Sequence, residues 1–248
     1  YASRGLGDVY KRQGYDRLSK RLSLKGFEYM KIKAYGKVNI SLDVVGKRED
    51  GYHLLSMIMQ NIDLYDEIEV EKQECGIILE CNKSYVPVDN RNLAYKAAEI
   101  FKERYDIVDG VKINIEKNIP VSAGLAGGST DAAAVLKVMN KLFNVNATEE
   151  ELMELGLKLG ADIPYCIHGG TALCEGIGEI ITPIKPFRDK IVVLVKPAFG
   201  VSTKEVYKNF NLEKVKQHPK TAEIINAIEN DDLNFVCLLY TSPSPRDA

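Results

Sequence analysis

The stretch from 120 to 134, PVSAGLAGGSTDAAA, constrains this chain more than any other, because three glycines and two hydroxyl residues lie directly at the front of a predicted helix. Alternating apolar residues over 111–115 predict a strand before it, and apolar residues at helical spacing over 132–143 predict the helix. A helix N-terminus has unpaired N–H groups and a partial positive charge. Glycines at 124, 127 and 128 would let the backbone take positive φ and let a phosphate come close. The stretch therefore predicts a phosphate-binding loop, and an ordinary loop with Ser and Thr as helix caps is the alternative.

The spacing of these glycines excludes two common phosphate loops. No lysine follows Gly128, so the stretch is not a Walker A motif, and it contains no G-x-G-x-x-G dinucleotide motif. From Pro120 to Thr130 the residues instead match P-x-x-x-G-L-x-x-[GS]-[ST]-[ST]. This pattern resembles the nucleotide loop of the GHMP small-molecule kinases, such as galactokinase, homoserine kinase, mevalonate kinase and phosphomevalonate kinase.

The resemblance implies an α+β fold of two domains, the first like ribosomal protein S5 domain 2 and the second ferredoxin-like. We expect an ATP-binding domain at 30–172 and a partial C-terminal domain at 173–237. The implied cofactors are ATP and Mg²⁺, with Ser129 or Thr130 as candidates for reaching the metal and no other ligand assigned. Asn92 is a candidate for the adenine side. The residues implied to hold the ATP phosphates are Pro120, Val121, Ser122, Ala123, Gly124, Leu125, Ala126, Gly127, Gly128, Ser129 and Thr130.

An alternation of apolar and polar residues over 32–44 predicts a strand with one polar face. Lys37 and Asn39 are two residues apart, so both project from that face. The segment GKREDGYH at 46–53 then predicts a turn that presents Tyr52 beside His53. An aromatic ring and an imidazole together could stack on and hydrogen-bond a planar base. A solvated strand face and a structural His53 are the alternatives.

The segments 34–53, 56–68, 159–164 and 195–207 resemble one member of the GHMP family closely, and the resemblance extends from Met30 to about Cys237. That member phosphorylates the 2-hydroxyl of a cytidine diphosphate-linked methylerythritol in the non-mevalonate isoprenoid pathway. The resemblance implies the following residue roles. Asp162 would be the catalytic base with Lys37 beside it, Asn39 would contact substrate phosphate, and Tyr52, His53 and Tyr207 would bind the cytidine, with cytosine between rings 52 and 207.

Elsewhere the pattern predicts paired strands near 66–81 and a helix from Leu93 to Tyr105. Thr148 and Glu151 predict a capping box for a helix that ends at Gly160. Ile163 and Pro164 are expected to hold the chain extended after Asp162. Apolar runs at 178–184 and 190–196 predict strands that lead into the second domain.

Composition narrows the class of partner. The 248 residues are 45% apolar with a formal charge of −2, and they show neither a basic stripe for nucleic acid nor a run long enough to span a membrane. The five cysteines form no C-x-x-C pair, which favours a reducing cytoplasm over a disulfide framework or a zinc site. Residues 1–29 and 238–248 are interpreted as non-native, with Met30 as the natural start.

Two alternatives remain at this point. A different GHMP kinase acting on an unlinked alcohol would not need the aromatic residues at 52 and 207, and a binding module without catalysis would not need Lys37 and Asp162. The family also carries a third glycine motif, G-[ST]-G-[PA], that is not found between 189 and 248. We therefore expect this chain to behave as an incomplete, poorly soluble or nearly inactive kinase.

Overall fold

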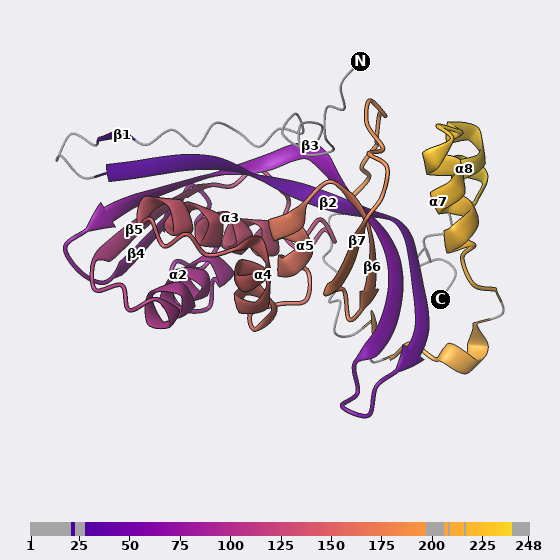
Figure 1. Ribbon diagram of the computed structural model, residues 1–248, viewed down its shortest axis with the longest axis horizontal. Helices are drawn as coiled ribbons and strands as arrows, with labels where there is room; N and C mark the ends of the chain where they lie inside the picture. The colour runs from indigo at the N-terminus through magenta and orange to yellow at the C-terminus, as the bar shows by residue number, and fades with distance from the viewer. Residues whose placement is uncertain (1–20, 23–27, 197–205, 208, 216, 240–248) are drawn as a thin grey trace, which may run out of the picture.

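In the computed structural model the chain forms one mixed sheet, with helices over one face at one end and a long bent hairpin at the other (Figure 1). The structure describes residues 21–22, 28–196, 206–207, 209–215 and 217–239. Most of the two ends interpreted as non-native, and most of the predicted segment 195–207, lie outside these residues. No helix in the described part is long and apolar enough to cross a membrane.

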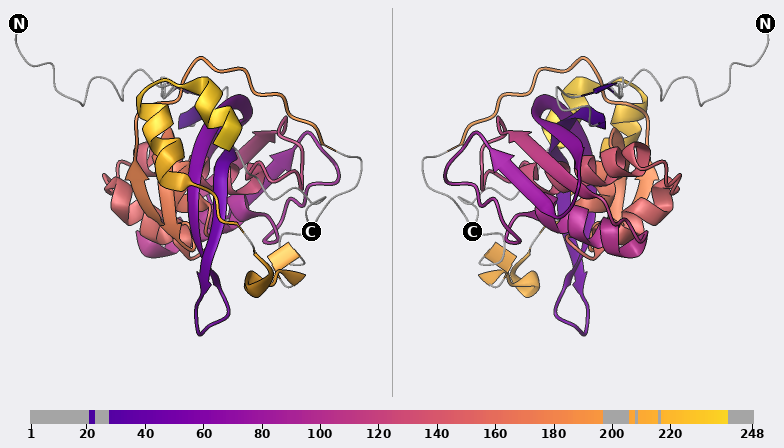
Figure 2. Two further views of the ribbon diagram at one scale, coloured as in Figure 1. Left: turned by 90° about the vertical axis from the view of Figure 1, so that its right-hand side faces the viewer. Right: turned by 90° about the vertical axis from the view of Figure 1, so that its left-hand side faces the viewer.

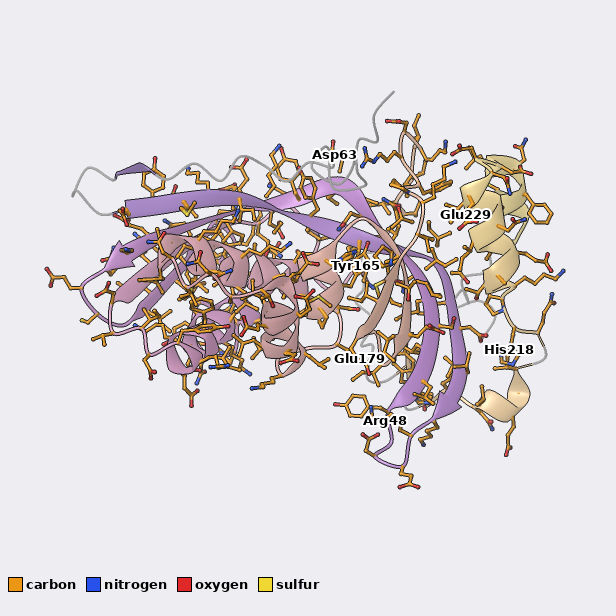
Figure 3. All side chains as sticks on the ribbon, in the orientation of Figure 1. Arg48, Asp63, Tyr165, Glu179, His218 and Glu229 are labelled. Carbon is orange, nitrogen blue, oxygen red and sulfur yellow. The ribbon has the colours of Figure 1, made fainter. Side chains whose placement is uncertain are left out.

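The hairpin of β2 (Glu28–Lys47) and β3 (His53–Gln73) is the backbone of the sheet. Its tip, where Arg48 is labelled in Figure 3, projects beyond the rest of the molecule in both views of Figure 2. The two strands pair antiparallel over their whole length, with register shifts at Tyr35/Lys37, Asn39/Ser41 and Val44/Gly46. These shifts bend the hairpin.

The length of β3 lets it pair with two different partners on its second edge. Its first half pairs with β6 and its second half with β5, both antiparallel. The described sheet has the order β1-β2-β3-β5-β4, with β6 and β7 branching from β3. The remaining strands are β1 (Arg21–Leu22), β4 (Ile77–Cys81), β5 (Gly110–Glu116), β6 (Thr171–Gly176) and β7 (Ile180–Pro183).

A layer of four helices covers the sheet end that contains β4 and β5 (Figure 1). They are α2 (Leu93–Arg104), α3 (Gly127–Leu142), α4 (Glu149–Leu157) and α5 (Ile163–His168). The alternating residues Val111, Ile113 and Ile115 are all buried against α2 and α3. The predicted capping box is confirmed, since Thr148 and Glu151 exchange side-chain to backbone bonds at the start of α4.

At the other end, α7 (Thr221–Glu229) and α8 (Leu233–Leu239) pack on the bent hairpin, and a short helical turn η1 (Leu212–Lys214) precedes them. Figure 2 shows this helix pair lying across the hairpin. Ile40 and Ile58 of the hairpin form a small core with Ile224 and Ile228 of α7. The expected domain boundary at 172/173 falls inside β6, and β6 belongs to the same sheet as the other described strands. The two-domain division stays a prediction.

Three local predictions were wrong. Ile163 and Pro164 begin helix α5 instead of an extended segment, because proline is tolerated in the first turn of a helix. The strands β3 and β4 near 66–81 do not pair with each other, since β5 lies between them. Residues 190–196 form no strand although 180–183 do; strand propensity depends on a partner, and no described strand pairs with 190–196.

Candidate active site

The glycine loop ends at the start of α3, as predicted, but its glycines act differently from expectation. Among the three, only Gly124 has positive φ, at 72°, and the other left-handed residues of the loop are Ser122 and Ala126. Gly127 and Gly128 already belong to the first turn of α3. Ala126 is the N-cap residue and offers no side-chain cap, so the first N–H groups of α3 are left for an external acceptor.

Gly127 is instead required for close packing, whereas a side chain at position 128 would make only an ordinary contact. A Cβ at position 127 would lie 2.9 Å from Nζ of Lys117 and 3.1 Å from Cγ2 of Ile119. A Cβ at position 128 would lie 3.6 Å from Cδ1 of Leu93, so the start of α2 adjoins the loop. The first turn of α3 is therefore packed tightly against the segment that follows β5 and lies next to the start of α2.

Lys37 and Asp162 meet beside this loop, as the sequence predicted. Nζ of Lys37 lies 3.7 Å from Oδ1 of Asp162 and donates to Oδ1 of Asn39 at 3.2 Å. The Lys37 side chain is only 6% exposed, whereas that of Asp162 is 39% exposed. Asp162 precedes α5 without capping it, which leaves its carboxylate directed to Lys37 and to solvent. A carboxylate accessible from outside and paired with a buried cation is suited to accept a proton from a hydroxyl group.

Asn61 of β3 links the two sides of this pair and was missed by the sequence analysis. Its Nδ2 donates to the carbonyl of Gly36 at 3.3 Å, next to Lys37, and its Oδ1 accepts the N–H of Gly170 at 2.6 Å, just after α5. Tyr165 of α5 donates to the Gly170 carbonyl at 2.7 Å, and Figure 3 shows its ring between the helical layer and the hairpin. An amide among the apolar residues of 57–64 was the only sequence signal.

The predicted base-binding residues lie where the hairpin meets residues 206–210. The rings of His53 and Tyr207 are stacked with centroids 5.1 Å apart, and Phe210 contacts His53 edge-on at 5.8 Å. Tyr52 is 59% exposed and lies in the hairpin turn. Burial, reinforced by the charge of Asp162, raises the pKa of Tyr207, so this ring lies within the electrostatic influence of Asp162. His53 is therefore the ring that stacks on Tyr207, and the placement of cytosine between rings 52 and 207 stays a prediction.

Comparisons with known proteins bear on this arrangement. Residues 92–170, which include the loop and Asp162, match the GHMP kinases N terminal domain. The chain is 73% identical over 207 residues to the 4-diphosphocytidyl-2-C-methyl-D-erythritol kinase of Clostridium botulinum (strain Eklund 17B / Type B), covering 84% of this chain and 74% of the relative. It is 72% identical, with the same coverage, to the enzyme of that name from Clostridium beijerinckii.

The chain belongs to the 4-diphosphocytidyl-2-C-methyl-D-erythritol kinase family. A crystal structure of 4-(cytidine 5'-diphospho)-2C-methyl-D-erythritol kinase superposes with a TM-score of 0.67 at 33% identity, covering 82% of this chain and 72% of that one. Homoserine kinase from Cytophaga hutchinsonii superposes with a TM-score of 0.62 at 15% identity, which shows the shared fold alone. Like the rest of its family, the chain is an ATP-dependent kinase of the GHMP fold.

Two other residues predicted to bind ATP or the metal, Asn92 and Thr130, form hydrogen bonds within the protein. Oδ1 of Asn92 caps α2 by accepting the N–H of Ala94, and its Nδ2 donates to the Pro87 carbonyl, so its adenine role would have to come from its position beside the loop. Thr130 is buried and its hydroxyl donates to the carbonyl of Gly127 at 2.9 Å. Ser129 is partly exposed, which makes it the better candidate of the two hydroxyls for the metal.

Two cysteine thiols, those of Cys166 and Cys174, lie close enough to Asp162 to be affected by its charge. Neither is suited to act as a nucleophile. Burial raises the pKa of Cys174 to about 12 and that of Cys166 still further, and the charge of Asp162 adds to the effect at both. The thiolate is the reactive form of cysteine, so both side chains are inert at neutral pH.

Proposed function

We propose that this chain transfers the γ-phosphoryl group of ATP to the 2-hydroxyl of 4-diphosphocytidyl-2-C-methyl-D-erythritol. The observation that carries the proposal is the Lys37–Asp162 pair, whose side chains lie 3.7 Å apart. The backbone N–H of Lys37 in β2 also donates to the carbonyl of Leu125 in the glycine loop. The names of relatives at 72–73% identity support the choice of substrate.

In this proposal Asp162 accepts the proton of the attacking hydroxyl. Lys37 pairs with this carboxylate and would stabilise negative charge on the phosphoryl group during its transfer. Asn39 accepts a hydrogen bond from the Lys37 ammonium and would contact a substrate phosphate. Phosphoryl transfer needs mainly positioning and charge stabilisation from protein, which these few groups provide.

The uncapped first turn of α3 would receive the ATP phosphates through its N–H groups. Mg²⁺ would neutralise phosphate charge there. Among the described residues no group of three or more His, Cys, Asp or Glu could hold a metal ion. Kinase Mg²⁺ commonly takes one or two protein ligands and its remaining ligands from phosphates and water, so a single hydroxyl such as that of Ser129 fits such an ion.

The cytidine would bind at the aromatic residues. Tyr52 offers an exposed ring, and His53 with Tyr207 offers a prebuilt stacked edge. A base held there would require a nucleotide-linked alcohol, which separates this function from mevalonate or homoserine phosphorylation.

The proposal is tested by assaying ADP formation with three acceptors at equal concentration: 4-diphosphocytidyl-2-C-methyl-D-erythritol, mevalonate and homoserine. We expect turnover with the first alone, and loss of that turnover in Asp162→Asn. Faster turnover of mevalonate or homoserine would overturn the substrate assignment. Phosphorylation of the cytidine substrate at another hydroxyl, detected by ³¹P–¹H NMR, would overturn the site of transfer.

A further inference from the structure

Three ionisable side chains meet in the interior directly behind the glycine loop. Nζ of Lys117 lies 2.5 Å from Oδ2 of Asp66 and 2.7 Å from Oδ2 of Asp131. The three side chains are 5%, 0% and 3% exposed. They come from β3, from the residue after β5, and from α3, and we call them the buried triad.

Burying these charges opposes folding unless their geometry is good. Desolvation costs several kcal/mol per ion, and apolar residues of equal volume often stabilise a core as well or better. The neighbouring helix face is rich in alanine, valine and leucine, so the fold has apolar alternatives at this place. Buried charges that join separate elements are best attested as devices that fix one arrangement.

The triad fixes both ends of the glycine loop. Oδ1 of Asp66 accepts the N–H groups of Asn118 and Ile119 at 2.5 and 2.8 Å, which sets the path of the chain into the loop. Asp131 lies one turn into α3, which sets the path out of it. Lys117 joins the two carboxylates between these ends.

The ammonium group of Lys117 also packs against the first turn of α3. A Cβ on Gly127 would lie 2.9 Å from Nζ of Lys117, so the backbone of the first turn packs against this nitrogen without room for a side chain. The N–H groups of that turn are the ones left for phosphate. A displaced or missing ammonium would therefore move the donors themselves.

Burial shifts the pKa values of two members of the triad, Asp131 and Lys117. Burial raises the pKa of Asp131 to about 8, although the Lys117 cation opposes the shift. Oδ1 of Asp131 has no hydrogen-bond partner among the described residues, so a proton can occupy it. Burial lowers the pKa of Lys117, but the two carboxylates outweigh this and leave it above its ordinary value. Burial thus favours the neutral form of Asp131, and the two aspartates favour the charged form of Lys117.

We propose that Lys117, held by Asp66 and Asp131, is a positioning residue that fixes the first turn of α3 for nucleotide binding. The inference rests on the proposed function in assigning phosphate to this turn. It assigns no chemical step to Lys117, which would act through the backbone of Gly127 and its neighbours.

The test compares Lys117→Met with wild type by calorimetric binding of ADP and by separate KM values for ATP and for the cytidine substrate. We expect the Kd of ADP and the KM of ATP to rise about tenfold, equivalent to about 1.4 kcal/mol, while the KM of the cytidine substrate stays within about twofold. Lys31→Met is the matched control, because Lys31 forms an exposed ion pair with Glu69 on the same sheet, and it should change neither value.

A second variant keeps the test decisive if Lys117→Met fails to fold. Gly127→Ala retains all three charges and places a methyl group against Nζ of Lys117, so it should show the same selective loss of ADP. A folded Lys117→Met or Gly127→Ala that binds ADP like wild type would overturn the inference, as would equal weakening of both substrates. A wild-type chain that bound no ADP would overturn the proposed function as well.

Discussion

The backbone N–H of Lys37 donates a hydrogen bond of 3.1 Å to the carbonyl of Leu125, so the strand with the proposed catalytic cation is tied directly to the glycine loop. Gly36 permits this contact, since a Cβ there would lie 3.4 Å from the same carbonyl and 3.3 Å from that of Leu64. The register shift between Tyr35 and Lys37 turns the lysine inward at this point. A shift of the glycine loop would therefore also move Lys37, the proposed partner of Asp162.

We expect Asp162→Asn to lower kcat by about 10²–10⁴-fold while ADP still binds, because the change removes a general base and keeps its volume. Lys37→Met should also lower kcat, and the double variant should lose little more than the worse single one, because the two residues act as a unit. Steady-state kinetics and ADP calorimetry check this. Near-normal turnover in Asp162→Asn would make Asp162 a bystander.

Asn61→Ala should lower both stability and kcat. Loss of the amide leaves the Gly170 N–H and the Gly36 carbonyl without their partner, which costs about 1–2 kcal/mol, and it loosens the Lys37–Asp162 spacing. Asn118→Ala is a suitable control, because Asn118 also donates to two carbonyls but at an exposed position. Equal kinetic effects of both variants would argue against a positioning role for Asn61. Urea denaturation and kcat measurements distinguish these cases.

Tyr52→Ala should weaken the cytidine substrate about tenfold or more without changing stability, because base stacking is worth about 1–3 kcal/mol and this ring is largely exposed. His53→Ala should weaken the same substrate and also destabilise residues 206–210, since its ring packs on Tyr207 and Phe210. ATP affinity should be unchanged in both. Equal weakening of ATP in the KM measurements would place these residues at the adenine end instead.

Stability should depend on pH through Asp131. Its folded pKa of about 8 lies above its ordinary value of 3.8, so the folded state binds more protons between these values and this contribution to stability is lost as pH rises. The charged or titratable groups around Asp131 are Lys117, Asp66 and Cys166. Asp131→Asn should therefore gain stability relative to wild type from pH 5 to pH 8 in urea titrations. A constant difference would show that Asp131 is ionised throughout.

The sequence alone determined those features that depend on neighbouring residues. The alternation over 32–44, the capping box at Thr148 and the strand-loop-helix around the glycines follow from local periodicity and capping chemistry, and each is present. The family resemblance, and not local periodicity, named Lys37 and Asp162 as a pair, and the structure brings them together.

Tertiary structure decided what depends on distant partners. Asn61 and Gly170 are 109 residues apart in the chain, and Lys117 and Asp66 are 51 apart, so no local pattern indicates either bond. The burial of Lys37 comes from register shifts that alternation does not encode. Residues 190–196 show the converse, because an apolar run predicts a strand that forms only where another strand pairs with it. Periodicity specifies which residues lie on the same face of a strand or helix. Long-range packing decides which other elements that face contacts.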